Sequence, residues 1–167
     1  MSALADAVRS RLADASQLYH QLLLVVGGQG SGKTAALREL SESGPFPLVN
    51  VNLALSQRLL EFTSKARPLR LPRLLDEIVA GIGGSVVLLD NIEILFDPTL
   101  RQDPLRCLQG ISRNRTIVAT WNGTARGRTL TCAEPRHREY RRYTDVDAML
   151  VSTSCNSDAG ADEGDAR

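Results

Sequence analysis

The stretch GGQGSGKT at residues 27–34 is the part of this sequence best suited to chemistry. It fits the pattern G-x-x-x-x-G-K-[ST] in full, a glycine-rich loop whose backbone N–H groups turn toward one point. An apolar strand at Leu22–Val26 is expected before it, and an Ala/Leu-rich helix is expected to begin at Lys33. Because a helix N-terminus favours negative charge, the arrangement predicts a phosphate-binding loop of the Walker A type.

Two side chains of this loop have predicted roles of their own. Lys33 is expected to reach the β and γ phosphates of a nucleotide, and the Thr34 hydroxyl is expected to ligate Mg²⁺. No N-K-x-D sequence follows the fourth predicted strand, so GTP specificity is not expected and ATP is the predicted nucleotide. The remaining loop residues are expected to surround the phosphates, and they are Gly27, Gly28, Gln29, Gly30, Ser31 and Gly32.

A second stretch, VVLLDNIEILF at residues 86–96, offers the acidic groups that such a loop needs. Asp90 ends an apolar strand, as a Walker B acid does, and is predicted to hold Mg²⁺ at the carboxyl edge of the sheet. Asn91 stands where many ATPases have a glutamate, and an amide can orient water but is too weak a base to deprotonate it. Glu93 is the candidate base, provided that the backbone after Asp90 turns toward the γ-phosphate; otherwise it is a solvated carboxylate.

Hydrolysis also needs polar groups around the attacked phosphate. Thr120, at the end of the fourth predicted strand, is expected to lie between water and γ-phosphate, and Asn122 is an alternative, although Asn122-Gly123 is also a turn signal. Three arginines are candidates for an arginine finger that completes the site of a neighbouring subunit: Arg113, Arg141 and Arg142. The same arginine-rich region also suits a contact with DNA or protein, or a solvated basic surface.

Strands and helices alternate along the rest of the chain, which predicts an α/β fold with a mostly parallel sheet and helices on both faces. The predicted strands lie at residues 22–26, 48–51, 86–89, 116–120, 129–133 and 148–151. The predicted helices cover residues 2–19 and 33–43, a short segment capped by Asn52, residues 72–83 after a loop at 64–70, and a segment beginning at Pro104.

The composition predicts one domain. A chain of 167 residues can bury a single core, and no apolar run reaches the ~20 residues that a membrane-spanning helix needs. The isolated Cys107, Cys132 and Cys155 support neither a disulfide framework nor a zinc site. We therefore predict a cytoplasmic protein with a P-loop nucleotide-binding domain over residues 1–151 and a disordered acidic tail over residues 152–167.

Taken with the loop, three further segments resemble BrxF, the small P-loop protein family of type-3 bacteriophage exclusion (BREX) systems. These segments are LDNIEILFD at residues 89–97, QDPLRCLQGISRNRT at 102–116 and the region around EYRRY at 139–143. The resemblance covers about residues 20–145 and implies a nucleotide-binding component that works beside other BREX proteins. The order of elements is also similar to the ATPase half of AAA+ proteins, without their helical lid, which implies an open adenine side and weak binding unless a partner or self-association covers it.

The predicted function is accordingly that of an ATP-binding protein of anti-phage defence, either an oligomerising Mg-dependent ATPase or an ATP-gated switch. The alternative is a non-hydrolysing adaptor that keeps its shape with bound nucleotide while it docks DNA or another defence protein. Asn91 favours the adaptor, whereas Glu93 and Thr120 favour hydrolysis. A small-molecule kinase is a third alternative, but no arginine-bearing lid after the third strand supports it.

Overall fold

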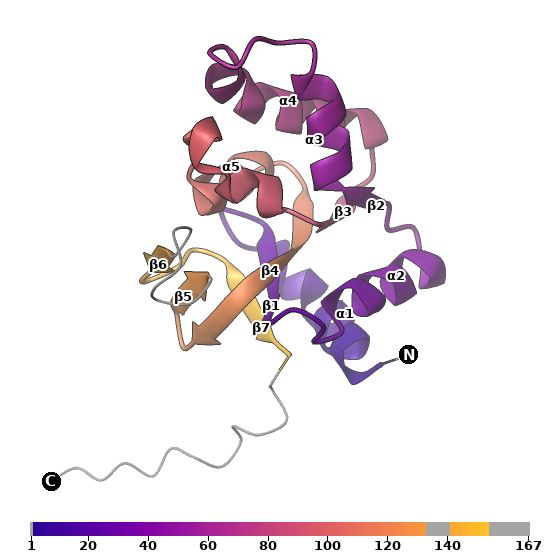
Figure 1. The fold of residues 1–167 in the computed structure, drawn as a ribbon. Coiled ribbons are helices and arrows are strands. Elements are labelled where there is room, and N and C mark those ends of the chain that lie inside the picture. The colour runs from indigo at the N-terminus through magenta and orange to yellow at the C-terminus, as the bar shows by residue number, and fades with distance from the viewer. Residues whose placement is uncertain (1, 133–140, 154–167) are drawn as a thin grey trace, which may run out of the picture.

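Parallel strands form the central sheet in the computed structural model, which describes residues 2–132 and 141–153 (Figure 1). Within these residues the strand order is β2-β3-β4-β1-β7, and each neighbouring pair is parallel. The strands are β1 (Leu22–Gly27), β2 (Leu48–Asn50), β3 (Val86–Asp90), β4 (Thr116–Arg126) and β7 (Met149–Ser152). Their carboxyl ends therefore meet at one edge of the sheet, where ligands bind in folds of this kind.

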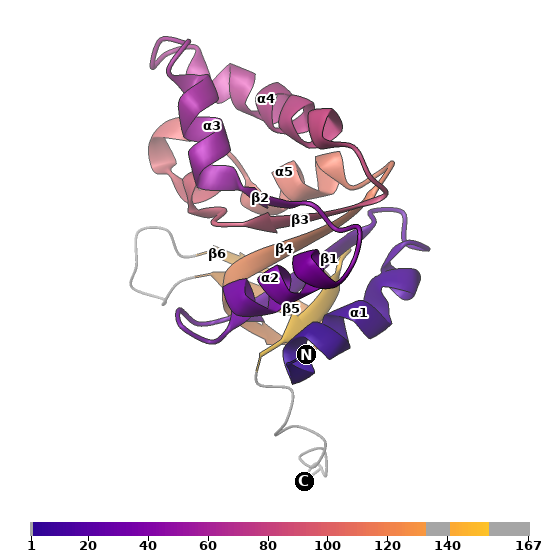
Figure 2. The same cartoon turned by 90° about the vertical axis from the view of Figure 1, so that its right-hand side faces the viewer.

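Helices cover both faces of this sheet (Figure 2). On one side lie α1 (Ala3–Ala15) and α2 (Lys33–Ser43), and on the other lie α3 (Val51–Leu59), α4 (Arg67–Ile82), α5 (Pro104–Ile111) and two short 3₁₀ helices, η1 (Glu93–Phe96) and η2 (Pro98–Leu100). The buried strand β1 shows why both faces are covered: Leu22, Leu24 and Val26 join the core under α3–α5, whereas Leu23 and Val25 join the core under α1 and α2.

This arrangement confirms the predicted three-layer α/β fold, with a mostly parallel sheet and helices on both faces. In the part of the chain that the structure describes, every element after α5 is a strand, so no helical lid is present there. None of the described helices has the length and apolar character needed to cross a membrane.

The fourth strand is much longer than its predicted span of residues 116–120. It continues through Asn122 and Gly123 to Arg126 and pairs antiparallel with β5 (Thr129–Cys132), which in turn pairs with β6 (Arg141–Tyr143). The turn signal at Asn122-Gly123 is therefore misleading, because these two residues lie within the strand. The reversal lies at residues 127–128 instead, where Gly127 has a φ of 57°.

An aromatic cluster holds this extension of β4 against the core. Trp121 is fully buried and packs edge-on against both Phe96 and Tyr143. Its indole N–H donates to the carbonyl oxygen of Thr131 at 3.0 Å, which fastens β5 to β4. The apolar packing of a large aromatic side chain thus outweighs the local turn preference of the Asn-Gly pair.

Other predicted boundaries need smaller corrections. The first helix ends at Ala15 rather than at residue 19, and α4 begins at Arg67, inside the segment predicted as a loop, with Pro72 in its interior. Asn50, not Asn52, caps α3, because its side chain accepts a hydrogen bond from the N–H of Leu53. The last strand extends to residue 152, which the predicted tail included, and residues 154–167 lie outside the described residues.

Gly123 leaves no room for a side chain where β4 and β5 meet. A Cβ atom at this position would lie 1.8 Å from the carbonyl oxygen of Thr131, which is backbone and cannot swing away. We expect Gly123→Ala to lower the free energy of unfolding by about 2–4 kcal/mol in urea denaturation, because the two strands must separate.

The matched control for this change is Gly110→Ala in α5. A Cβ atom there meets nothing within 4 Å, so the added helix propensity should leave stability equal or raise it by roughly 0.5–1 kcal/mol. Equal stability of the Gly123→Ala protein and the parent would contradict the close approach of β5 to β4.

Candidate nucleotide-binding site

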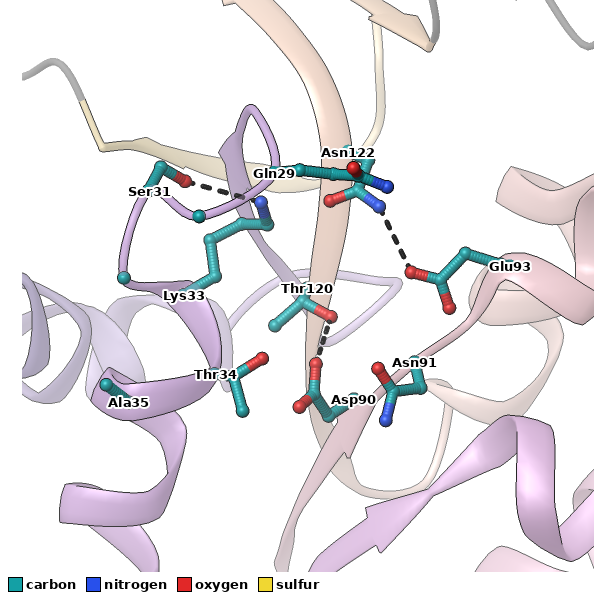
Figure 3. A pocket seen from close by; sticks show the side chains of 12 residues that line it. Gln29, Ser31, Lys33, Thr34, Ala35, Asp90, Asn91, Glu93, Thr120 and Asn122 are labelled. Carbon is teal, nitrogen blue, oxygen red and sulfur yellow. Dashed lines mark hydrogen bonds between the residues drawn. The ribbon is translucent and has the colours of Figure 1, made fainter.

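Strand register brings the predicted site residues together at the carboxyl edge of the sheet. Gly27, the last residue of β1, pairs with Asn122 of β4, and Asp90, the last residue of β3, pairs with Asn50 of β2. A pocket of about 420 Å³ opens at this edge (Figure 3). It is lined by loop residues 29–35, by Asp90, Asn91 and Glu93 after β3, and by Thr120 and Asn122 of β4.

The glycine-rich loop has the backbone shape of an anion site. Gly30 and Gly32 have φ values of 71° and 92°, in the left-handed region that other residues rarely adopt, and α2 begins directly after Gly32. The first turn of this helix thus presents its N–H groups to the pocket. Gly27 and Gly28 do not line the pocket; they contribute their carbonyl oxygens to hold Lys33, as described next.

Lys33 is buried in the loop that it belongs to. Its ammonium group donates to the carbonyl oxygens of Gly27 at 2.9 Å and Gly28 at 2.6 Å, and to the hydroxyl of Ser31 at 3.3 Å. Burial lowers the pKa of Lys33 below that of a free lysine, and the carboxylates of Asp90 and Glu93 oppose this shift. The loop therefore holds a desolvated ammonium group in place before any phosphate arrives.

Asp90 and Thr34 provide oxygen atoms suited to a magnesium ion. Asp90 is only 7% exposed, and one carboxylate oxygen accepts a 2.8 Å hydrogen bond from the hydroxyl of Thr120. Its second oxygen has no hydrogen bond to another described residue, and Thr34 lines the same pocket. In Figure 3 the Thr34 hydroxyl and the Asp90 carboxylate face each other across the pocket. Hydroxyl and carboxylate oxygens are the ligands that Mg²⁺ takes beside nucleotide phosphates, so the residues present fit the ion.

The chain turns sharply between Asp90 and Glu93. Asn91 has a φ of 53°, and η1 begins at Glu93, so the backbone bends back toward the pocket instead of continuing away from the sheet. Asn91 and Glu93 consequently both line the pocket. The backbone after Asp90 thus turns toward the pocket, and the role of Glu93 as a base stays a prediction.

Two amide groups hold the Glu93 carboxylate. Asn122 donates to one oxygen at 3.0 Å, and Asn52 donates to the other at 3.4 Å. Asn52 also accepts a 2.7 Å hydrogen bond from the N–H of Ile94, and its own backbone N–H donates to the carbonyl of Asn91 at 2.9 Å. Glu93 is thus oriented by residues that follow β2 and end the parallel part of β4.

Asn52 was missed as a site residue by sequence reasoning, which treated it as a helix cap. The one sequence signal for a role of Asn52 in the site is its position after a predicted strand, whose carboxyl end lies at the same edge of the sheet as Asp90. Because the Ile94 N–H loses its partner in Asn52→Ala, we expect the free energy of unfolding to fall by about 1–2 kcal/mol in urea denaturation.

The isosteric change Asn52→Asp separates the two roles of Asn52. Aspartate keeps an oxygen for the Ile94 N–H and should retain most of the stability, but it loses the N–H that Asn52 donates to Glu93. If the Asn52→Ala protein were as stable as the parent, the hydrogen bond between Asn52 and the N–H of Ile94 would contribute nothing to the free energy of unfolding.

The three candidate finger arginines lie apart from this pocket. Arg113 precedes β4 at the opposite edge of the sheet, and its guanidinium stacks over the ring of Tyr19 at 4.9 Å. Arg141 donates to the carbonyl of Gln102 at 3.0 Å, whereas Arg142 is exposed and has no hydrogen bond or ion pair to another described residue. The structure brings none of them to the site of their own chain, so any role in a neighbour's site stays a prediction. Residues 133–140 of this arginine-rich region lie outside the described residues.

Comparisons with known proteins leave the family of this chain open. No family model matches the sequence, and no curated protein matches it. Among solved structures, C. elegans PCH-2 is similar, with 17% sequence identity and a TM-score of 0.47 over 90% of this chain and 42% of that chain. The chain thus spans less than half the length of that protein. We base the fold on the strand order and the loop, and the BrxF resemblance stays a prediction.

Proposed function

We propose that this protein binds ATP with Mg²⁺ at the carboxyl edge of its sheet. The observation that supports the proposal is that Lys33, Thr34 and Asp90, the three residues to which the sequence motifs assign phosphate and magnesium roles, all line one pocket. Lys33 supplies positive charge, the helix N-terminus supplies backbone N–H groups, and Thr34 with Asp90 supplies the oxygen ligands of the ion. A magnesium ion held there neutralises phosphate charge.

We further propose that the bound nucleotide is hydrolysed, with Glu93 as the base. Glu93 lies in the pocket, and hydrogen bonds from Asn122 and Asn52 orient its carboxylate. Asn91 lines the pocket and would orient water, although an amide cannot take the proton of that water. Thr120 also lines the pocket, and its hydroxyl donates a hydrogen bond to Asp90. None of the arginines in the described ranges 2–132 and 141–153 lines the pocket, and we propose that an arginine from a second copy of the chain completes the site for fast turnover.

One observation favours the alternative, a nucleotide-bound adaptor that does not hydrolyse ATP. Both oxygens of Glu93 already accept hydrogen bonds from amide groups, and Asn91 replaces the carboxylate that many ATPases have next to the Walker B acid. A protein of this kind would use ATP to keep its loop and helix α2 in shape while another surface contacts a partner.

The resemblance to BrxF supports a place in a BREX anti-phage system, with other BREX proteins as partners. The alternative partner is DNA, contacted through the arginine-rich region. The BREX assignment rests on the segments at residues 89–97, 102–116 and 139–143, and the DNA alternative rests on the arginines between residues 113 and 143.

Steady-state turnover of Mg·ATP by the purified chain, over a range of protein concentrations, tests the proposed function. Turnover per chain that rises steeply with concentration indicates an ATPase completed by a neighbouring copy. Binding without turnover at every concentration indicates the adaptor. Absence of Mg·ATP binding contradicts both.

A further inference from the structure

Gln29 is a polar residue of the glycine-rich loop whose side chain has no role in the proposed binding of phosphate or magnesium. It lines the pocket, is exposed, and has no hydrogen bond to another described residue. The other polar side chains of the loop are already engaged: Ser31 donates to the carbonyl of Gly28 at 2.6 Å, and Lys33 donates to loop carbonyls. Thr34 faces Asp90, on the magnesium side.

Gln29 lines the pocket from the loop that follows β1. Gly27 pairs with Asn122, so Gln29 follows two residues beyond this pair, where β1 passes into the loop. Figure 3 shows the carboxamides of Gln29 and Asn122 at one end of the pocket, with Glu93 beside Asn122 and the Thr34–Asp90 pair at the other end. Gln29 therefore lies on the side of the pocket where the base is held.

Two amide side chains that line the pocket, those of Gln29 and Asn91, have no hydrogen bond to another described residue, and of the two only Gln29 belongs to the glycine-rich loop. The side-chain N–H₂ of Asn122 donates to Glu93 at 3.0 Å, whereas no described residue accepts from the N–H₂ of Gln29. An amide N–H is a good hydrogen-bond donor to phosphate oxygens, and a bond to a charged acceptor is stronger than one between neutral groups. The loop thus carries an uncommitted donor beside the candidate base.

We propose that Gln29 contacts the terminal phosphate of a nucleoside triphosphate, so that its side chain distinguishes triphosphates from diphosphates. This inference rests on the proposed nucleotide site, and it holds whether or not the nucleotide is hydrolysed. Gln29 is accordingly a specificity-determining residue, and the loop discriminates by number of phosphates as well as binding them through its backbone.

The test measures affinity for two ligands by titration calorimetry in Mg²⁺: a non-hydrolysable ATP analogue and ADP. We expect Gln29→Ala to reduce the preference for the triphosphate by on the order of ten-fold while ADP affinity stays within about two-fold of the parent. Gln29→Glu, which has nearly the same shape but adds negative charge, should reduce triphosphate affinity further. Gln57→Ala is the matched control, because Gln57 is an exposed glutamine of α3 outside the pocket.

Three results would overturn the inference. The first is a triphosphate preference in both Gln29 variants that equals that of the parent. The second is an equal loss of affinity for both nucleotides, which indicates that Gln29 only shapes the loop. The third is a parent protein without any triphosphate preference. Failure of the parent to bind either nucleotide contradicts the proposed function itself, and is therefore distinguishable from the first two results.

Discussion

The Lys33→Ala protein is expected to bind Mg·ATP at least about 100-fold more weakly than the parent, a loss of roughly 3 kcal/mol. Lys33 is the only lysine or arginine among the residues that line the pocket, and its burial among loop carbonyls means that no neighbouring cation can take its place. Equilibrium titration with a fluorescent ATP analogue measures the loss directly.

The control for this change is Lys65→Ala, which removes the only other lysine of the sequence, an exposed residue between α3 and α4. It should bind as the parent does. Lys33→Met tests whether the loop simply collapses, because methionine retains much of the lysine volume without its charge. If the Lys33→Met protein binds ATP with the affinity of the parent, Lys33 does not contribute to phosphate binding.

Because burial lowers the pKa of Lys33, the pH dependence of binding has a defined sign. The charged form of Lys33 binds phosphate, so affinity should decline as pH rises through a pKa lower than the 10.5 of free lysine. The Lys33→Met protein should lack this decline.

The Glu93→Gln protein is expected to retain Mg·ATP affinity within about three-fold and to lose turnover by about 100-fold or more. Glutamine keeps an oxygen that can accept from Asn122 at the position of the Glu93 carboxylate, but it cannot take a proton from water. Phosphate release under steady-state conditions, with affinity measured on the same preparation, separates the chemical step from binding.

Glu61→Gln is the matched control for this change, since Glu61 is also exposed but lies at the end of α3, outside the pocket. Its turnover should equal that of the parent. If the Glu93→Gln protein still hydrolyses ATP at the parent rate, the base is not Glu93, and a group from another copy or partner takes the proton. A parent protein that binds but does not turn over identifies the adaptor instead.

The fold class and the strand–glycine loop–helix unit were predictable from local sequence alone. A buried apolar strand, a run of glycines that ends in Lys33-Thr34, and a helix of good helix formers form one continuous unit of about 20 residues. Each signal acts over one or two turns of chain, so the physics of the loop does not depend on distant residues. The position of Asp90 follows from similar reasoning, because a polar residue after an apolar strand must emerge at the carboxyl edge.

Local signals were misleading where packing opposed them. Asn122-Gly123 has the composition of a turn, but burial of Trp121 between Phe96 and Tyr143 extends β4 through it. The loop expected at residues 64–70 likewise gave way to the start of α4 at Arg67. The guanidinium of Arg67 donates to the carbonyls of Leu59 and Phe62, and so closes the end of the preceding helix.

The sequence by itself therefore determined the α/β fold class, the glycine-rich loop that ends in Lys33-Thr34, and which carboxylates are available near it. Only the tertiary structure decided how the end of the pocket around Glu93 is built. Asn52, Glu93 and Asn122 lie on different segments, and no periodicity in the chain links them. They meet because β2, β3 and β4 pair in parallel. The carboxyl ends of these strands therefore lie at the same edge of the sheet, together with the residues that follow them. Gln29, to which we assign the nucleotide specificity, lines the same pocket two residues beyond Gly27, the residue of β1 that pairs with Asn122.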